Sequence, residues 1–187
     1  MLMFVTGGVR SGKSSFAEQL ALRTAQKHRL SLHYIATSVP TDDEMKKRIA
    51  IHRRIRDQSP LSWKTWEFPL PNSHVISHFG KEDVVLLDCL TTWIGNVFFH
   101  HFEADDQKRL HDTHNVADDV LNTIQAISNH VHTFILVSNE LLHDGIMDDS
   151  LVFSYKRVIG SWRHQEIVKQ ADKAFLVEEG IALMMKG

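Results

Sequence analysis

The amino-acid sequence predicts a single α/β domain, spanning residues 1–187, with a mainly parallel sheet flanked by helices. Short apolar runs, typical of strands buried on both faces, alternate along the chain with segments whose apolar residues repeat at helical spacing. No linker, repeat or low-complexity tract interrupts this alternation. A β-α-β-α order of this kind brings successive strands into parallel pairing and places helices on both faces of the sheet.

The first half of the chain contains four expected strands and two expected helices. Residues 2–6 form an almost wholly apolar run that ends at a glycine pair, and residues 13–26 follow with a helical pattern. The next apolar run, 32–36, precedes a basic helix expected over 41–56, which opens with the capping-box sequence Thr41-Asp42-Asp43-Glu44. Residues 63–68 alternate apolar and polar side chains, and residues 83–88 form a buried-type strand that ends in an aspartate.

The second half continues the same alternation. Residues 91–102 and 105–130 are expected to be helical, the second segment on a clear 3.6-residue pattern. Residues 133–137 form another core strand. A helix over 150–171 and two strands over 173–178 and 181–186, which meet around Gly180, complete the domain.

Composition restricts the class of protein. The formal net charge is −2 and there is no basic run, so we expect no nucleic-acid partner. No stretch approaches the roughly 18 apolar residues that a membrane span needs, and the apolar start of the chain is too short for a signal peptide. The single cysteine, Cys89, excludes an internal disulfide and fits a reducing compartment. We therefore expect a cytoplasmic protein.

The 13 histidines raise the hypothesis of a metal site. His100, His101, His111 and His114 cluster in the sequence, and the last two have the i,i+3 spacing of a shared helix face. Aspartate and glutamine surround them, and neither a cysteine nor a tight repeated spacing supports structural zinc. We expect these histidines to lie on a solvated helix surface.

The turn after the first strand has the form G-x-x-x-x-G-K-[ST], the pattern of a P-loop. Glycines let backbone N–H groups turn toward phosphates, and the following helix directs its positive end at them. Lys13 is expected to reach the terminal phosphates, and the Ser14 hydroxyl to ligate Mg²⁺. The predicted phosphate-binding residues are Gly7, Gly8, Val9, Arg10, Ser11, Gly12, Lys13 and Ser14.

A P-loop needs a second acid, at the end of a neighbouring strand, to organise Mg²⁺. Asp88 ends the apolar run 84–87 and fits that role, although it could instead cap the helix that begins near Thr91. Glu140 also follows a core strand and is a second candidate. Ligands of open α/β sheets bind at the carboxyl ends of the strands, so these acids should converge with the P-loop.

Further motifs follow the P-loop in order through most of the chain. They are Tyr34-Ile35-Ala36-Thr37-Ser38, Asp42-Asp43-Glu44-Met45, Arg48-Ile49, His52-Arg53, Trp63-x-Thr65-x-Glu67-x-Pro69, Leu87-Asp88-Cys89-Leu90-Thr91 and Ser138-Asn139-Glu140. This ordered series resembles the bifunctional adenosylcobinamide kinase/adenosylcobinamide-phosphate guanylyltransferase family of cobalamin synthesis, and it is far more specific than the P-loop alone.

The resemblance implies a two-step enzyme with a RecA-like P-loop fold that assembles as a homo-oligomer, a trimer. The family phosphorylates adenosylcobinamide and then transfers GMP from GTP onto the product, through GMP bound covalently to a histidine. GTP, ATP or both are thus the implied co-substrates, with Mg²⁺ as cofactor and a corrinoid as acceptor. His52 stands where the family has its guanylylated histidine.

The chemistry of the residues is compatible with that role. A neutral imidazole nitrogen can attack an α-phosphorus and leave a labile phosphoramidate, and Arg53, Arg54 and Arg56 could neutralise phosphate charge. Without the resemblance, the ordinary interpretation of His52 is a surface histidine on a basic helix.

Three further residues complete the expected site. The same resemblance implies that Glu67 contacts the guanine nucleotide. The alternative is that Glu67 is a solvent-facing strand residue. Thr37 and Ser38 follow the second strand and could touch the nucleotide or simply form a turn.

The sequence departs from the family after Glu140. Where the family has Gly-x-Gly-Ile-Val-Pro, only Gly145-Ile146 remains, and residues 156–165 lack the aspartate and asparagine of the family's next helix. The changed segment 141–165 leaves two alternatives open. One is a P-loop kinase of another small molecule, and the other is a nucleotide-binding regulatory relative that lacks one activity.

Overall fold

Seven strands form one sheet in the order β3-β2-β4-β5-β1-β6-β7. The computed structural model describes residues 1–39, 43–71, 73–101, 109–139 and 164–187. The strands are β1 (Leu2–Gly7), β2 (Ser31–Ala36), β3 (Trp63–Glu67), β4 (Asp83–Asp88), β5 (Thr133–Asn139), β6 (Lys173–Glu178) and β7 (Ile181–Lys186). Every neighbouring pair is parallel except β6 and β7, which form an antiparallel hairpin. The prediction of a mainly parallel sheet is therefore confirmed.

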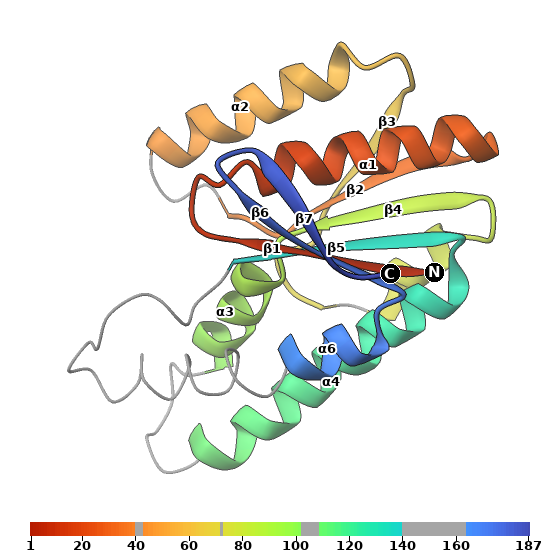
Figure 1. The fold of residues 1–187 in the computed structure, drawn as a ribbon. Helices are drawn as coiled ribbons and strands as arrows, with labels where there is room; N and C mark the ends of the chain where they lie inside the picture. The colour runs from red at the N-terminus through yellow and green to blue at the C-terminus, as the bar shows by residue number, and fades with distance from the viewer. Residues whose placement is uncertain (40–42, 72, 102–108, 140–163) are drawn as a thin grey trace.

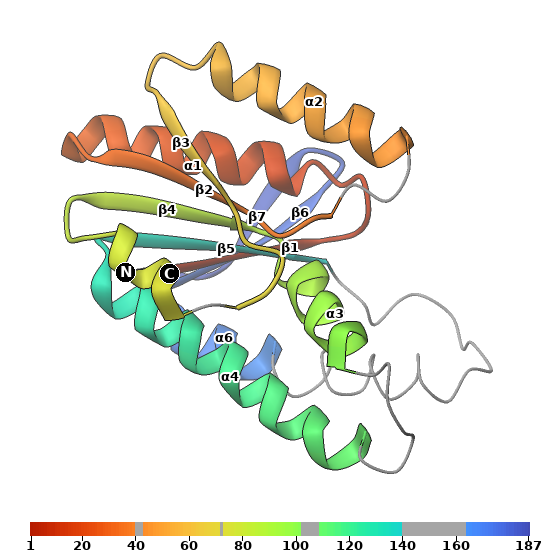
Figure 2. The same ribbon diagram turned by 180° about the vertical axis from the view of Figure 1, so that it is seen from behind.

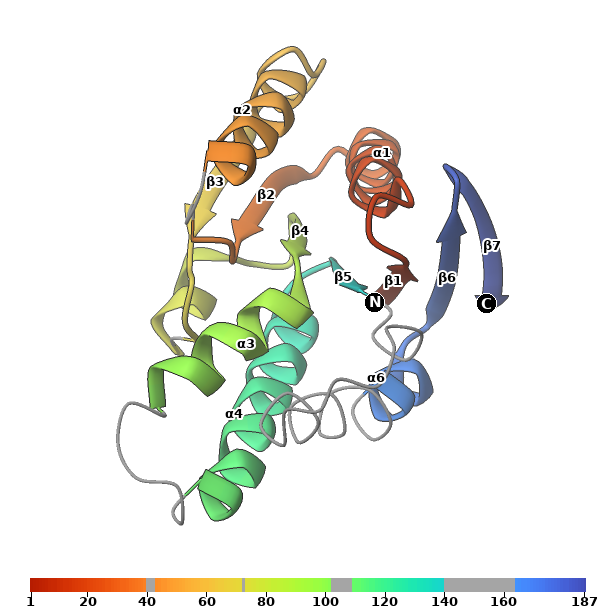
Figure 3. The same cartoon turned by 90° about the vertical axis from the view of Figure 1, so that its left-hand side faces the viewer.

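Helices cover both faces of this sheet (Figure 1, Figure 2). The helices α1 (Lys13–His28) and α2 (Asp43–Asp57) lie on one face, and α3 (Leu90–His101), α4 (Arg109–His130) and α6 (His164–Gln170) lie on the other. Figure 3 shows that α1 lies over the centre of the sheet, whereas α2 lies toward the β3 edge.

The apolar side chains of each strand divide between the two faces. Met3 and Val5 of β1 pack with alanines of α1, while Leu2 and Phe4 belong to the second core cluster, with residues of α3 and α4. The alanines of α1 are Ala17, Ala21 and Ala25, which are completely buried and recur every four residues. This smooth helix face allows α1 to lie close to the sheet, and it thereby fixes the loop that precedes the helix.

The predicted elements match the observed ones apart from their ends. Strand β5 runs on to Asn139, past the predicted end at residue 137. The 3-10 helix η1 (Ser73–His78) was not expected from the sequence patterns. Of the helix expected over 150–171, residues 164–170 form α6, and 150–163 lie outside the described residues. Within the described part of the chain, no helix is both long and apolar enough to cross a membrane.

A buried histidine joins three strands at the β3 edge of the sheet. His33 of β2 is 2% exposed, and its Nδ1 accepts a hydrogen bond from Nε1 of Trp66 in β3 at 3.0 Å. The other ring nitrogen, Nε2, lies 3.3 Å from Oδ1 of Asp83 in β4. Since an indole N–H can only donate, the proton of the neutral imidazole resides on Nε2, facing the carboxylate. Burial lowers the pKa of His33, although Asp83 opposes this shift.

The lowered pKa makes folding sensitive to acid. An unfolded histidine has a pKa of 6.5, so below that pH the unfolded chain binds a proton that His33 in the folded chain does not yet bind. The contribution of His33 to the free energy of unfolding is therefore complete above pH 6.5 and is lost as the pH falls through the lower folded-state pKa.

We expect the melting temperature of the wild-type protein to fall more steeply between about pH 7.5 and pH 5 than that of His33→Asn. The asparagine oxygen can still accept the hydrogen bond from Trp66, but it does not titrate. Thermal unfolding of both proteins across this range checks the expectation, and parallel profiles would contradict it.

Candidate functional site

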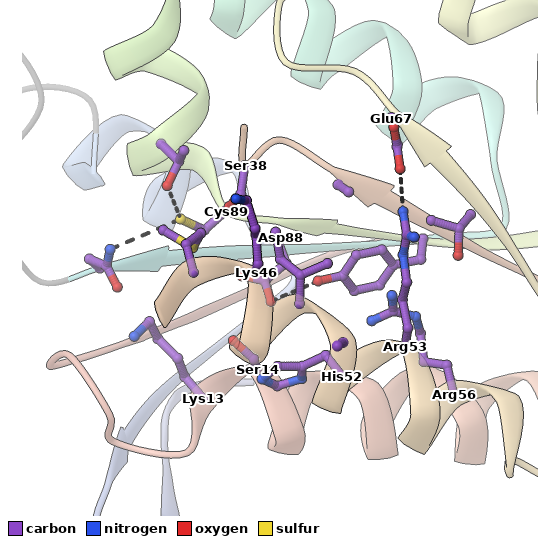
Figure 4. A pocket seen from close by; sticks show the side chains of 18 of the residues that line it. Lys13, Ser14, Ser38, Lys46, His52, Arg53, Arg56, Glu67, Asp88 and Cys89 are labelled. Atoms are coloured by element: carbon purple, nitrogen blue, oxygen red, sulfur yellow. Dashed lines mark hydrogen bonds and ion pairs between the residues drawn. The ribbon is translucent and has the colours of Figure 1, made fainter. Parts of the chain in front are cut away.

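The carboxyl ends of the parallel strands meet at one edge of the sheet, where a pocket of about 520 Å³ lies. Strands β2, β3, β4 and β5 end at this pocket with Ala36, Glu67, Asp88 and Asn139. The strand register brings these ends level, since Ala36 is paired with Glu67 on one side and with Asp88 on the other. Figure 4 shows the labelled side chains that α1, α2, β3 and β4 contribute to the pocket.

The loop between β1 and α1 has a shape that two glycines permit. A Cβ at Gly7 would lie 2.2 Å from the carbonyl oxygen of Val177 in β6. Gly12 has a φ of +89°, which favours glycine, and a Cβ there would lie 3.2 Å from the Cα of Gly180. The N–H of Gly180 also donates a hydrogen bond of 2.8 Å to the carbonyl of Ser11. The end of β6 and the turn into β7 therefore support the loop.

The side chains that begin α1 face the pocket. Lys13 is almost completely buried, and its Nζ donates a hydrogen bond of 2.9 Å to the carbonyl of Gly8. Ser14 lines the pocket beside it. Nearer the solvent, Arg10 forms an ion pair of 2.9 Å with Glu44 of α2. The loop thus contacts the helix that carries the candidate nucleophile.

A buried carboxylate connects the two helices on this face of the sheet. Glu18 of α1 is 6% exposed; its Oε1 accepts a hydrogen bond of 3.0 Å from Nη1 of Arg56 and lies 3.5 Å from Nδ1 of His52. Arg56 is itself 5% exposed, and its guanidinium lies 3.7 Å above the ring of Tyr34. His52 and Arg56 are one helical turn apart, so the same face of α2 presents both to Glu18.

Glu18 was not among the residues selected from the sequence. The helical spacing nevertheless places Glu18 on a buried face of α1, because residue 18 shares that face with the buried residues Ala21 and Ala25. A carboxylate on a buried helix face requires a partner, and this requirement could have singled it out.

The groups around His52 change the pKa of its imidazole. The pKa of His52 is raised, first by the interaction of Nδ1 with the Glu18 carboxylate, and burial opposes this effect. The charges of Glu18 and Asp88 raise the pKa further, whereas the charge of Arg56 lowers it. Nδ1 is buried on the side of Glu18, so Nε2 is the ring nitrogen that can face the pocket.

Two polar contacts lie on the strand side of the pocket. The Tyr34 hydroxyl donates a hydrogen bond of 3.1 Å to Oδ2 of Asp88. Burial raises the pKa of Tyr34, and the charge of Asp88 raises it further, so the phenol remains a donor. Arg53 of α2 forms an ion pair with Glu67 of β3, which links the helix to the edge strand across the pocket.

Most of the predicted site residues meet at this pocket. Those that line it are Val9, Arg10, Lys13, Ser14, Ser38, His52, Arg53, Arg56, Glu67 and Asp88. Gly7, Gly8, Ser11 and Gly12 form the remainder of the phosphate loop. Arg54 is exposed and does not line the pocket.

Thr37, unlike Ser38, does not line the pocket. It is completely buried, and its hydroxyl accepts a hydrogen bond from the N–H of Cys89 at 2.8 Å and donates one to the Cys89 carbonyl at 2.9 Å. A hydroxyl engaged in this way joins the ends of β2 and β4.

Some residues considered from the sequence cannot be placed. Glu140 and residues 141–163 of the divergent segment lie outside the described residues, as do the side chains of His100, His101, His111 and His114. In the part of the chain that is described, no group of three or more His, Cys, Asp and Glu side chains is arranged to hold a metal ion.

Comparison with known proteins identifies relatives along the whole chain. A family model described as cobinamide kinase / cobinamide phosphate guanyltransferase matches residues 3–185. The bifunctional adenosylcobalamin biosynthesis protein CobP of Pseudomonas aeruginosa is 33% identical over 184 residues, covering 98% of this chain and 96% of that protein. Proteins named bifunctional adenosylcobalamin biosynthesis protein CobU, from Salmonella typhimurium and Escherichia coli, are 31% and 32% identical, with 100% of both chains covered in each case.

Solved structures add a likeness of fold. A KaiC-like protein from Pyrococcus horikoshii superposes with a TM-score of 0.50 at 12% sequence identity, covering 99% of this chain and 78% of that chain. This likeness concerns the fold alone, and it agrees with the RecA-like P-loop class expected from the sequence.

The phosphate loop yields a test of its packing. We expect Gly7→Ala to lower the free energy of unfolding by about 1–3 kcal/mol, because the new methyl group would overlap a backbone carbonyl of β6. Gly8→Ala is the matched control, since nothing lies within 4 Å of a Cβ at that position. Its effect should stay within about 0.5 kcal/mol. Chemical denaturation measures both, and equal losses would contradict the expectation.

Proposed function

Since this chain belongs to the cobinamide kinase / cobinamide phosphate guanyltransferase family, we propose that it phosphorylates adenosylcobinamide and then transfers GMP from GTP onto adenosylcobinamide phosphate. Membership of this family makes it a transferase of cobalamin biosynthesis. The proposal includes a guanylyl-histidine intermediate at His52. The observation that supports it best is that His52, from α2, lines the same pocket as Lys13 and Ser14, from α1.

The phosphate loop would serve both steps. Lys13 and the backbone N–H groups of the loop would hold the phosphates of GTP or ATP, as P-loops do. Ser14 and Asp88 line the same pocket and offer oxygen atoms, the donor type that Mg²⁺ prefers. The hydrogen bond from Tyr34 orients the Asp88 carboxylate. When bound, Mg²⁺ would neutralise charge on the phosphates.

The walls of the pocket suggest how the nucleotide would be held during GMP transfer. Arg53 and Arg56 supply positive charge on the helix that carries His52. Glu67 lies across the pocket, bound to Arg53, and would accept hydrogen bonds from the guanosine part of GTP. Ser38, two residues after the end of β2, completes this side.

We further infer that the protein works in the cytoplasm as a homo-oligomer, a trimer by resemblance. Strand β7 lies at one edge of the sheet and exposes four apolar side chains, Ile181, Leu183, Met184 and Met185. An edge strand with exposed apolar side chains is a surface that another copy of the chain can cover.

The wild-type protein should sediment as an oligomer of the 21.5 kDa chain. If β7 contributes to the contact, Leu183→Glu should sediment at a smaller mass, because it places a charge on that surface. Sedimentation velocity of both proteins tests this inference, and a monomeric wild-type protein would contradict it.

The proposed intermediate can be tested with GTP labelled at the α-phosphate. We expect the wild-type protein to become labelled through a bond that is stable in base and labile in acid, as a phosphoramidate is. His52→Ala should form no labelled protein, because the attacking nitrogen is absent, yet it should still bind nucleotide. Gel autoradiography and a fluorescent-nucleotide binding assay measure the two properties.

Lys13→Ala is the comparison variant for this experiment. It should impair both the kinase step and GMP transfer, because both would use the same phosphate loop. Undiminished labelling of His52→Ala would remove that residue from the nucleophile role. A wild-type protein that is never labelled would favour a P-loop kinase of another small molecule, and rescue of a strain unable to salvage cobinamide would exclude a purely regulatory relative.

A further inference from the structure

A buried carboxylate lies 3.5 Å from the inner nitrogen of the imidazole proposed as nucleophile. We propose that Glu18 is a positioning residue for GMP transfer, which keeps the His52 Nδ1 proton on its own side and thereby presents the Nε2 lone pair to the pocket. This inference rests on the proposed function and deepens it. It assigns a role to a residue that touches neither GTP nor the corrinoid in the proposed reaction.

The location of the Glu18 carboxylate is strongly constrained. It lies one helical turn after Ser14, and only 7% of its side chain is exposed. A buried carboxylate needs compensating partners, and Arg56 supplies a charged one at 3.0 Å. Arg56 is in turn held over the ring of Tyr34, at 3.7 Å from the ring centre. An acceptor fixed in this way can orient the ring that approaches it.

The contact selects one tautomer of His52. A neutral imidazole has one N–H and one lone pair, and the partner of each nitrogen decides which is which. An ionised carboxylate only accepts, and it lies 3.5 Å from Nδ1. The proton therefore resides on Nδ1, and the lone pair resides on Nε2.

This arrangement serves both halves of the transfer. In the first half the Nε2 lone pair forms a bond to the α-phosphorus of GTP, the bond from that phosphorus to the bridging oxygen breaks, and pyrophosphate leaves with the electron pair. The ring gains a positive charge, which the Glu18 carboxylate offsets, and the Nδ1 proton stays in place. In the second half a phosphate oxygen of the acceptor attacks the same phosphorus, and the electrons of the N–P bond return to Nε2. A ring that keeps its Nδ1 proton leaves more readily.

Charged groups reach His52 from three elements. Glu18 of α1 and Asp88 of β4 raise the pKa of His52, and Arg56 of α2 lowers it. The other charged side chains that line the same pocket are Arg10, Lys13, Lys46, Arg53 and Glu67. Removing the charge of Glu18 and removing the charge of Arg56 should therefore move the titration of His52 in opposite directions.

The experiment follows the rate of labelling of the full chain by α-labelled GTP as a function of pH. In the wild-type protein the rate should rise with pH, as His52 loses its second proton. Glu18→Gln should lower the maximal labelling rate, reached at high pH, by about tenfold to a hundredfold. It should also move the pH range over which the rate rises to lower values. Arg56→Gln removes the other member of the same buried pair, and it should move the pH range over which the rate rises to higher values.

The opposed shifts distinguish positioning from a merely structural role. If the pair only held α1 and α2 together, both variants would lose rate without opposed shifts, and that result would overturn the proposal. The proposal would also be overturned if Glu18→Gln had the same labelling rate and the same pH dependence as the wild-type protein. Loss of labelling in His52→Ala would still uphold the proposed function in that case. Labelling that persists in His52→Ala would instead refute the proposed function itself.

A second measurement does not depend on how the variants fold. Nitrogen-15 NMR of histidine-labelled wild-type protein, read at pH values where the ring is neutral, reports which nitrogen of His52 carries the proton. We expect Nδ1, as the position of Glu18 requires. Finding the proton on Nε2 would overturn the proposal.

Discussion

Parallel pairing of the strands from β3 to β6 is the constraint on which the rest of the structure depends. Parallel strands bring their carboxyl ends to one edge, and the register sets Ala36 level with Glu67 and Asp88. Packing on both faces fixes that register. A slip of one residue would exchange the side chains that face the alanines of α1 with those that face α3 and α4. The positions of the polar groups in the pocket are therefore set by the apolar core beneath them.

Features encoded in contiguous residues could be predicted from the sequence. The strands follow from the lengths of apolar runs, the phosphate loop from its glycine spacing, and Asp88 from its place at the end of a buried run. The two short strands that flank Gly180 were also predicted, whereas their antiparallel pairing was seen only in the structure. His52 was different. A single histidine on a basic helix has no local pattern that indicates catalysis, so its selection required the resemblance to a family.

Features that arise from packing between distant segments could not be predicted in the same way. Glu18 meets His52 and Arg56 only because α2 lies beside α1, and no local pattern in α2 encodes that contact. Thr37 could not be assigned either, since a hydroxyl after a strand suits a turn, a ligand contact or a strand-to-strand contact equally. In the structure its hydroxyl bonds to the backbone of Cys89, which directly follows the neighbouring strand β4.

The support of the phosphate loop by β6 and the turn into β7 has a consequence for the order in which the molecule is built. On the ribosome, the loop sequence emerges early, whereas the strand and turn that support it, with Val177 and Gly180, emerge long afterwards. Strand β1 must also wait for both of its neighbours, β5 and β6. Contacts of such long sequence separation form slowly. A nascent chain therefore displays the complete motif well before it possesses the phosphate cradle, which forms only when β6 and the turn after it are in place.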